Sequence, residues 1–199
     1  MKNYPIVETF HSIQGEGYWM GRNSFFIRLG GCDVGCWFCD TKESWPMDKH
    51  PQYSVEKLAQ EVLAVNPSMI VITGGEPLMH SLDELTQGLR AFCGLPLHLE
   101  TSGAYPFSGR FDWVTFSPKC FKSPHPSIGP YVDELKVVIT SPEDLKWAKE
   151  QAQFVQSTAV KFLQPEWNSP ETIDLTVKFV LEHPDWRMSL QTHKFLGLR

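Results

Sequence analysis

The chain has 199 residues, of which 42% are hydrophobic and 21% charged, and its formal net charge is −5. This length suits one domain, residues 1–199, with enough chain to bury a sizeable core. Without a lysine- or arginine-rich run, neither nucleic acid nor an anionic membrane is expected as the main partner. No apolar stretch is long enough to cross a bilayer, and Met1–Pro5 lacks a signal peptide's apolar core, so we expect a cytoplasmic protein.

Short apolar runs alternate with helical patterns along the chain, which favours an α/β fold with a mainly parallel sheet. The apolar runs predict strands at Phe25–Leu29, Met69–Thr73, Leu97–Glu100, Trp113–Phe116, Glu134–Ile139, Val160–Leu163 and Met188–Leu190. The helical patterns predict helices at Val55–Val65, Leu82–Phe92, Pro142–Gln151 and Pro170–Leu181. Because a full eight-stranded barrel needs about 250 residues, we expect a short, partial (β/α)6-type barrel of about six parallel strands.

Three of the predicted helices have marked starts. Ser81 precedes Leu82 and has Glu84 three residues after it, which predicts a capping box. Ser141 and Ser169 each precede a proline, which predicts a serine N-cap followed by proline at the first helical position.

Polar or glycine-rich residues follow the C-terminal ends of the predicted strands. These segments are Gly30-Gly31-Cys32, Gly74-Gly75-Glu76-Pro77, Thr101-Ser102-Gly103, Ser117-Pro118-Lys119 and Gln164-Pro165-Glu166. Parallel α/β folds carry their sites at this end of the strands, so we expect these segments to meet in one site. Two long loops, Thr41–Tyr53 and Ser117–Tyr131, are expected to be functional or mobile.

Three cysteines, Cys32, Cys36 and Cys39, lie within eight residues in the spacing C-x3-C-x2-C. A closed zinc site takes four ligands, and a [4Fe-4S] cluster bound only by protein takes four cysteines. The trio therefore predicts a cluster with one iron left free for a substrate or cofactor. The alternative is a zinc knuckle that uses His50 as the fourth ligand. Cys93 and Cys120 are interpreted as a buried apolar residue and a loop residue.

Several polar residues have two interpretations. Arg28 lies in an apolar strand, and composition favours a structural ion pair with Glu16 over the binding of an anionic substrate. Asp40 and Thr41 suit either a magnesium site or a turn that caps the loop. Lys119 is either a cofactor contact or a solvated loop lysine, and His193 either a substrate contact or a surface imidazole.

The cysteine spacing, with Phe38 directly before Cys39, resembles that of the radical S-adenosylmethionine (SAM) superfamily. The resemblance implies that three thiolates bind three irons of a [4Fe-4S] cluster and that SAM chelates the fourth. Reduction would cleave SAM to a 5′-deoxyadenosyl radical, and the Gly74–Pro77 segment would hold the SAM amino group. Trp37 and Phe38 would shield the cluster from water.

Further motifs occur in an order that resembles one family of that superfamily, the 7-carboxy-7-deazaguanine synthases of the queuosine and 7-deazapurine pathway. They are Gln14-Gly15-Glu16-Gly17, Arg28, the cysteine trio with Asp40-Thr41, Thr73-Gly74-Gly75-Glu76-Pro77, Glu100-Thr101-Ser102-Gly103, Ser117-Pro118-Lys119 and Gln191-Thr192-His193-Lys194. The resemblance implies a lyase that converts 6-carboxy-5,6,7,8-tetrahydropterin to 7-carboxy-7-deazaguanine, releases ammonia and regenerates SAM.

The resemblance also implies the residues of the site. Thr41 would hold Mg²⁺ against the substrate carboxylate. The SAM pocket would comprise Gly75, Glu100, Ser117, Pro118, Lys119 and Gln164. The pterin site would comprise Ile13, Gln14, Gly15, Glu16, Arg28, Thr73, His193 and Arg199. Arg199 stands where the family often ends in proline, and it is the residue whose C-terminal carboxylate would reach the substrate.

The resemblance further implies a homodimer and a reducing electron donor of the flavodoxin type. Two rival functions remain at the level of sequence. One is an enzyme that installs a glycyl radical on a protein partner, which would share the cysteine trio but not the polar set formed by Gln14, Glu16 and Arg28. The other is a non-catalytic module that carries a cluster or zinc.

Overall fold

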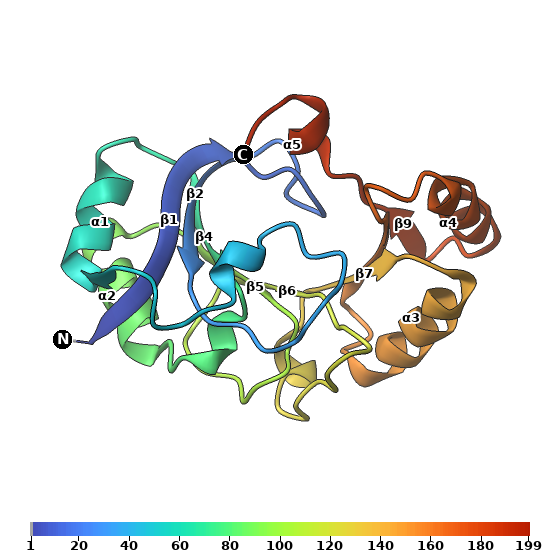
Figure 1. Cartoon of the computed structure of the whole chain (residues 1–199), viewed down its shortest axis with the longest axis horizontal. Helices are drawn as coiled ribbons and strands as arrows, with labels where there is room; N and C mark the ends of the chain where they lie inside the picture. The colour runs from blue at the N-terminus through green and yellow to red at the C-terminus, as the bar shows by residue number, and fades with distance from the viewer. Residues whose placement is uncertain (1) are drawn as a thin grey trace.

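The fold is built around one nine-stranded sheet, in a computed structural model that describes residues 2–199. The strand order is β3-β1-β2-β4-β5-β6-β7-β8-β9, and the sheet curves into an open partial barrel with helices outside it (Figure 1). From β2 to β9 all neighbouring strands are parallel, whereas β1 is antiparallel to β2 and to β3. The expected partial α/β barrel is confirmed, although within residues 2–199 the parallel part has seven strands, one more than expected.

The predicted strands are present, with shifts at their ends. Their bounds are β2 Asn23–Leu29, β4 Met69–Gly74, β5 Leu97–Thr101, β6 Trp113–Phe116, β7 Glu134–Ile139, β8 Val160–Pro165 and β9 Trp186–Met188. The prediction for β9 was wrong by two residues, because Trp186 and Arg187 already pair with β8. Ser189 follows β9, and its backbone N–H donates to the Leu163 carbonyl.

Two strands were not predicted, β1 Asn3–Ile13 and β3 Gln52–Ser54. The second half of β1 reads Glu8-Thr9-Phe10-His11-Ser12, which lacks an apolar run. This segment is a strand because its backbone pairs with β2, although its polar sequence does not predict a strand. Glu8 and Phe10 of this strand face the barrel interior, where the Glu8 carboxylate pairs with Arg28.

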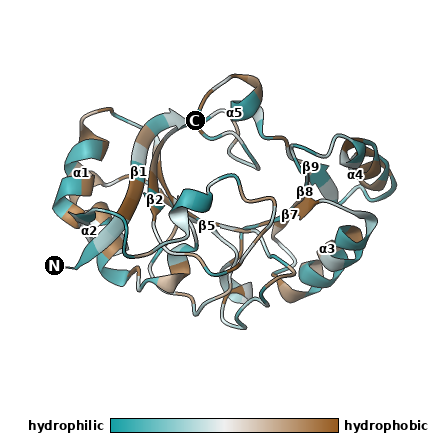
Figure 2. Ribbon diagram, viewed as in Figure 1, coloured by the Kyte–Doolittle hydropathy of each residue, from teal (hydrophilic) through white to brown (hydrophobic). Residues whose placement is uncertain are grey.

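Four predicted helices are confirmed and cover the outside of the sheet. They are α1 Val55–Leu63, α2 Asp83–Cys93, α3 Pro142–Phe154 and α4 Glu171–Glu182, and a short fifth helix, α5 Thr192–Phe195, was not predicted. These helices carry both hydrophobic and hydrophilic residues, as expected for helices with one face on a core (Figure 2).

Of the three predicted helix starts, one is confirmed and two are wrong. The N-cap at Ser141 is confirmed, since the Asp144 carboxylate accepts from the Ser141 backbone N–H at 2.9 Å. The capping box at Ser81 is wrong, because α2 begins at Asp83 and the Ser81 hydroxyl donates to that side chain. The N-cap at Ser169 is also wrong, because its hydroxyl donates to Glu166 and Pro170 holds the N-cap position.

Strand β2 shows how the sheet separates a core from a cavity. Phe25, Ile27 and Leu29 belong to the main hydrophobic cluster, which includes residues of α1 and α2. Phe26 and Arg28 alternate with them and point to the opposite side, where they line a cavity. A two-residue period thus places Arg28 inside the barrel.

The crossovers from β5 to β6 and from β6 to β7 contain no α-helix, which explains how a short chain completes the sheet. Tyr105, Phe107 and Phe111 of the first crossover pack against the core in place of a helix. The second crossover, part of the long loop predicted from Ser117, contains one 3-10 turn at Gly129–Tyr131. Within residues 2–199, no helix has the length and apolar character that a bilayer crossing requires.

Candidate active site

The barrel interior holds a cavity of about 480 Å³ at the C-terminal ends of the parallel strands. Its wall includes Cys32 after β2, Gly75 after β4, Ser102 after β5, Ser117 after β6 and Glu166 after β8. The expectation that the strand-end segments meet in one site is therefore confirmed. Of the residues proposed for the site, all line this cavity except Pro118, which is buried behind its wall.

The three clustered cysteines are free thiols that lie along this wall, each partly exposed. Two backbone bonds anchor the start of their loop, from Gly31 N to the Ser44 carbonyl and from Cys32 N to the Trp45 carbonyl. Burial raises the pKa of the Cys36 thiol to about 11, although the nearby Lys119 charge opposes this. Metal binding at Cys36 must therefore displace a proton from its thiol.

Gly75 lets two backbone segments meet beside the thiols. A Cβ atom at this position would lie 2.4 Å from the Gly31 carbonyl oxygen and 2.7 Å from the Cys32 Cβ. No residue with a side chain fits there without moving the cysteine loop. The glycine thus keeps the end of β4 directly against the start of that loop.

The geometry of the described residues does not support a zinc knuckle at His50. Among residues 2–199, no three His, Cys, Asp or Glu side chains converge closely enough to share one metal ion. His50 packs against Gly30, and it is absent from the cavity wall. A [4Fe-4S] cluster takes separate thiolates on its corners, so three thiols spread along one wall suit a cluster better than a single ion. Cys93, on α2, and the exposed Cys120 lie outside the cavity wall.

Glu76 ties the ends of two strands together and is only 1% exposed. Its carboxylate accepts hydrogen bonds from Leu78 N at 2.9 Å, Thr101 Oγ1 at 2.5 Å and Ser102 N at 2.7 Å. The side chain is thereby fully engaged with the protein. Glu76 fixes the wall, and the neighbouring glycines leave their backbone to face the cavity.

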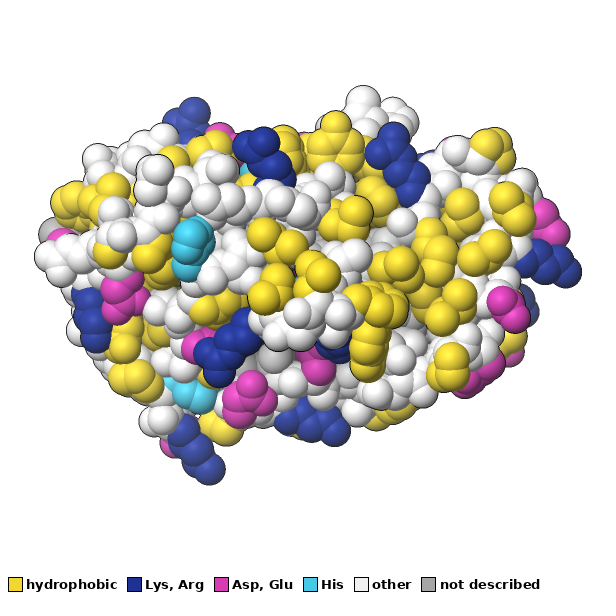
Figure 3. Space-filling view, turned by 90° about the horizontal axis from the view of Figure 1, so that it is seen from above, with side chains coloured by type: hydrophobic (Ala, Val, Ile, Leu, Met, Phe, Trp, Pro, Cys, Tyr) yellow, Lys and Arg dark blue, Asp and Glu magenta, His cyan; other side chains and the backbone are white. Residues whose placement is uncertain are grey.

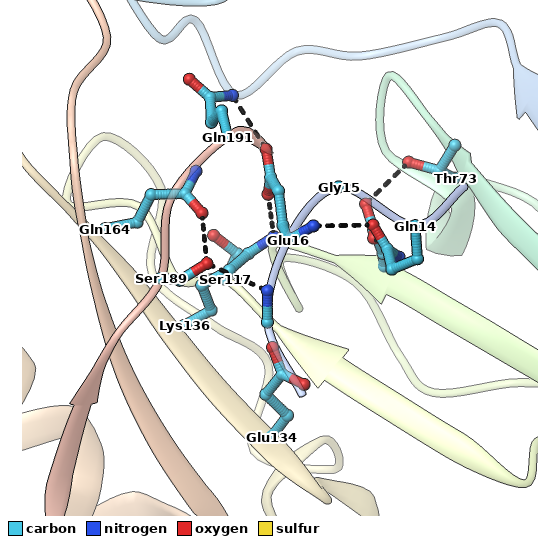
Figure 4. Close-up of polar contacts among 12 residues, drawn as sticks. Gln14, Gly15, Glu16, Thr73, Ser117, Glu134, Lys136, Gln164, Ser189 and Gln191 are labelled. Atoms are coloured by element: carbon cyan, nitrogen blue, oxygen red, sulfur yellow. Dashed lines mark hydrogen bonds and ion pairs between the residues drawn. The ribbon is translucent and has the colours of Figure 1, made fainter. Parts of the chain in front are cut away.

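Glu16 and Lys136 form an ion pair inside the cavity. One Glu16 oxygen pairs with the Lys136 ammonium, and the other accepts from Gln191 Nε2 at 2.8 Å (Figure 4). Burial alone would raise the pKa of Glu16, but the charge and hydrogen bond of Lys136 lower it to about 2. Burial alone would lower the pKa of Lys136, yet the carboxylates around it raise that pKa above its ordinary value.

The loop that carries Glu16 crosses the barrel and is held at both sides. Gln14 Nε2 donates to Glu100 on β5 at 2.8 Å, and Thr73 Oγ1 lies 3.5 Å from the same carboxylate. On the other side, Gly17 N donates to Ser189 Oγ, which in turn donates to the Gln164 side chain (Figure 4). These bonds fix Gln14 and Glu16 relative to the strand ends.

The predicted ion pair between Arg28 and Glu16 is wrong. Arg28 Nε donates to Glu8 Oε1 at 3.0 Å, and Glu8 lies opposite Arg28 in the neighbouring strand β1. Sequence reasoning missed this partner because it missed β1. With Nε bound to Glu8, the guanidinium has further N–H donors available at the cavity wall.

Lys119 is not a solvated loop lysine. Its ammonium donates to the Ser117 carbonyl at 2.5 Å and to the Ser117 hydroxyl at 2.6 Å, and both residues line the cavity. Burial lowers its pKa from the ordinary value. Lys119 is therefore a partly buried cation that lies close enough to Cys36 for each group to influence the pKa of the other.

Asp40 and Thr41 continue the cysteine loop along the wall. The Thr41 hydroxyl lies 3.7 Å from Cys39 Sγ. The Asp40 carboxylate forms an ion pair with Lys194 at 2.8 Å, which links the loop to α5. The Thr41 hydroxyl thus stands beside the thiols on the cavity wall.

The C-terminal segment, residues 191–199, lies over one side of the cavity. His193 packs against Gly15, where a Cβ would come within 2.1 Å of its ring, and Arg199 pairs with Glu8 at 2.9 Å. His193 is therefore a cavity residue, not an isolated surface imidazole. Phe195 is 66% exposed, and hydrophobic side chains gather across the face that includes this end of the molecule (Figure 3).

The sequence of this chain is similar to those of known radical SAM proteins. Residues 26–116 match the model of the Radical SAM superfamily. A 7-carboxy-7-deazaguanine synthase from Synechocystis sp. is 52% identical over 197 residues, which is 99% of this chain and 94% of the relative. The synthase of Flavobacterium psychrophilum is 45% identical, over 98% of this chain and 92% of its own. The chain belongs to the 7-carboxy-7-deazaguanine synthase family.

A solved member of the family supports the same conclusion from structure. The crystal structure of QueE from Escherichia coli has a TM-score of 0.86 and 31% sequence identity, and the match covers 96% of this chain and 95% of that one. As a radical SAM enzyme, this chain uses a [4Fe-4S] cluster and SAM as cofactors. The three free thiols and the bare backbone at Gly75 fit those groups.

Sequence reasoning assigned no individual role to several charged or polar residues of the wall, among them Glu8, Lys136, Gln191 and Lys194. Lys136 carried a usable signal, because it interrupts the apolar run Leu135-Lys136-Val137-Val138 in the way that Arg28 interrupts its own strand. The other three depend on tertiary contacts that local sequence patterns do not reveal.

Proposed function

We propose that this chain converts 6-carboxy-5,6,7,8-tetrahydropterin to 7-carboxy-7-deazaguanine with loss of ammonia. The observation that carries the proposal is that one cavity brings together the three thiols, the glycine wall of β4 and the polar set of Glu16 and Arg28. The 52% identical Synechocystis relative bears the name of this synthase. Residues 1–199 act as a single radical SAM domain in this account.

The cofactors would occupy the half of the cavity that the strand ends provide. Cys32, Cys36 and Cys39 would hold the cluster, and the SAM pocket would comprise Gly75, Glu100, Ser117, Pro118, Lys119 and Gln164. When bound, the reduced cluster and SAM supply a carbon radical that removes hydrogen from C6 of the substrate. Support comes from the bare Gly75 backbone and from the partly buried Lys119 ammonium, which suits a carboxylate.

Opposite charges would recognise the two ends of the substrate. The Glu16 carboxylate suits the adjacent N–H and NH₂ donors of the pterin edge, since its two oxygens accept in parallel. Arg28 would bind the anionic carboxylate through the guanidinium donors that Glu8 leaves free. Ile13, Gln14, Gly15, Thr73, His193 and Arg199 would complete this site.

Thr41 would hold a magnesium ion that also contacts the substrate carboxylate. Mg²⁺ keeps several waters and takes few protein oxygens together with substrate oxygens, so one hydroxyl beside the thiols is a suitable protein ligand. Asp40 is occupied by Lys194, and its role here is to hold the loop against α5. Magnesium in this position would stabilise negative charge on the substrate carboxylate.

The chain's own residues would orient the substrate and exclude water. The Gln191–Glu16 and Thr192–Gly15 hydrogen bonds join the C-terminal segment to the loop that carries the pterin residues. Such a cover matters because water near a reactive carbon intermediate opens side reactions. Holding C6 in reach of the cofactor also lowers the entropic part of the barrier.

Several properties of the protein in the cell follow from the same proposal. An external one-electron donor of the flavodoxin type would reduce the cluster, and a reducing compartment such as the cytoplasm would keep the thiols free. A homodimer is supported by α4, which exposes Ile173, Val177 and Leu181 at four-residue intervals.

The proposal is tested by anaerobic incubation of the cluster-loaded protein with SAM, a reductant, Mg²⁺ and the carboxylated tetrahydropterin. It predicts a new deazapurine absorbance and SAM recovered intact. The product should be about 17 mass units lighter than the substrate, which is the mass of the ammonia lost. Consumption of SAM without a deazapurine would contradict it and favour a glycyl-radical activating enzyme. Neither a deazapurine nor cleavage of SAM to 5′-deoxyadenosine under any condition would favour a non-catalytic cluster or zinc carrier.

A further inference from the structure

Lys136 is a buried cation that the proposed chemistry has not yet used. It lies in the middle of β7, its side chain is only 6% exposed, and it lines the cavity beside Val138. Its neighbours in the strand, Leu135 and Val137, point the other way into the hydrophobic core. The alternation of β7 therefore aims the ammonium into the barrel and against the Glu16 carboxylate.

Structural stabilisation is a weak explanation for this pair. Taking two charges out of water carries a large desolvation cost, and well-packed apolar residues often stabilise a fold equally well. The interior face of β7 already accommodates an apolar side chain at Val138. A charged pair at the cavity wall is more informative about what the cavity binds.

The surroundings of Glu16 would favour its neutral form without Lys136. Besides the pair itself, the titratable groups that act on it are Glu134 on β7, Glu100 on β5, Lys119 after β6 and His193 on α5. Glu134 and Glu100 are carboxylates that act on Lys136, and the Lys119 ammonium donates its hydrogen bonds to Ser117. Lys136 is the cation in direct contact with the Glu16 carboxylate.

The protonation state of Glu16 decides which ring edge the site can bind. A carboxylate offers two acceptor oxygens, which match two adjacent N–H donors, whereas the neutral acid offers one donor and one acceptor. Lys136 and Gln191 approach different oxygens of Glu16, so each oxygen keeps a free lone pair and the plane of the carboxylate is fixed.

We propose that Lys136 is a positioning residue for substrate recognition. It keeps Glu16 ionised and oriented, so that the site selects a 2-amino-4-oxo ring edge over an edge with oxygen at position 2. This inference rests on the proposed function, in which Glu16 contacts that edge. Lys136 itself does not touch the reacting carbon.

The test uses two fluorescent ring systems that differ only at position 2. The cluster-loaded protein with SAM is titrated anaerobically with 6-carboxypterin, which has a 2-amino group, and with 6-carboxylumazine, which has a 2-oxo group. Wild type should bind the pterin about 100-fold more tightly, as expected for two hydrogen bonds to a charged group. Lys136→Met should reduce this ratio to below about tenfold, because Glu16 becomes neutral.

Matched variants and pH separate positioning from a purely structural role. If Lys136 acts through Glu16, the double variant Lys136→Met/Glu16→Gln should discriminate no better and no worse than Glu16→Gln alone. The ratio for Lys136→Met should rise with pH between about pH 5 and pH 7, whereas that of wild type should stay constant. Lys136→Arg, which keeps the charge, should retain most of the ratio.

Each failure has a distinct meaning. If wild type discriminates and Lys136→Met does so equally, Lys136 has no role in recognition and the inference is wrong while the proposed function stands. If wild type binds neither ring, both are wrong. Should Lys136→Met fail to fold, the wild-type profile still decides: a ratio that falls as Glu16 protonates between about pH 7 and pH 5 overturns the inference.

Discussion

Arg28 Nε lies 3.0 Å from Glu8 Oε1, across the antiparallel pair of β1 and β2. The second Glu8 oxygen pairs with Arg199 at 2.9 Å, so a single carboxylate holds an arginine of the sheet and the last residue of the chain. Glu8 thereby balances the charge of Arg28 and fixes the plane of its guanidinium at the cavity wall. The two Nη groups remain as the donors for an anionic ligand.

Replacing Arg28 by lysine should weaken substrate binding although it keeps the charge. A lysine has one ammonium, which must choose between Glu8 and the substrate carboxylate. Affinity for 6-carboxypterin should fall about 10- to 100-fold, the loss expected for a hydrogen bond between charged groups. Fluorescence titration measures this, with pterin lacking the 6-carboxylate as the control ligand. Equal losses for both ligands would mean that Arg28 does not contact the carboxylate.

Cys36→Ala should abolish cluster binding, because two thiolates cannot hold what three hold. Anaerobically reconstituted protein should lose the brown chromophore and most of its iron. Cys93→Ala is the matched control, since Cys93 is a half-buried thiol at the end of α2 and outside the cavity wall. It should bind iron as wild type does. Full iron content in Cys36→Ala would refute the ligand assignment.

Thr41→Ala should slow turnover mainly by weakening the action of magnesium. The hydroxyl lines the cavity beside Cys39, and its removal leaves the ion with one fewer protein ligand. Turnover measured against Mg²⁺ concentration should require more metal and reach a lower maximum. Thr41→Ser keeps the hydroxyl and should preserve both values. A Thr41→Ala enzyme with an unchanged magnesium profile would remove Thr41 from the metal site.

The pH dependence of stability should report the Glu16–Lys136 pair. The pKa of Glu16 is lowered from 4.5 to about 2 in the folded protein. A carboxyl group whose pKa is lowered on folding stabilises the folded state at pH values above its ordinary pKa. That contribution is lost as the pH falls from about 4.5 towards 2. Glu16→Gln should therefore flatten the fall in unfolding free energy on acidification, by on the order of a few kcal/mol.

Urea unfolding of the cluster-free protein at several pH values below about 5 would measure this difference. Glu134 titrates in the opposite sense, because burial raises its pKa, but it is present in both proteins and cancels in the comparison. Parallel curves for wild type and Glu16→Gln would show that the pair does not hold Glu16 ionised.

Much of the site could be predicted from sequence because parallel strands all end at the same edge of a sheet. The residues after β2, β4, β5, β6 and β8 are far apart in the chain, yet the topology alone places them together. The cysteine spacing is local and equally readable. Gly75 was placed in the predicted SAM pocket, but the need for glycine there comes from the Gly31 carbonyl oxygen, which only the structure shows.

What could not be predicted depends on pairing between segments that are distant in sequence. The polar half of β1 carries no apolar pattern, so its Glu8 was not available as a partner and Arg28 was paired with Glu16 instead. Glu76 reads as part of a glycine motif, whereas its bonds to Thr101 and Ser102 appear only once β5 lies beside β4. The predicted capping box at Ser81 was wrong for the same reason, because the Leu82 backbone N–H donates to the hydroxyl of Ser108, which is distant in sequence.

The central claim is that the three thiolates of Cys32, Cys36 and Cys39 leave one iron of a [4Fe-4S] cluster open to SAM. Electron paramagnetic resonance of the reduced, reconstituted protein tests this most directly, recorded before and after SAM is added. The account predicts a [4Fe-4S] signal whose g-values shift on addition of SAM. A signal that SAM leaves unchanged, or protein that carries only zinc, would contradict it.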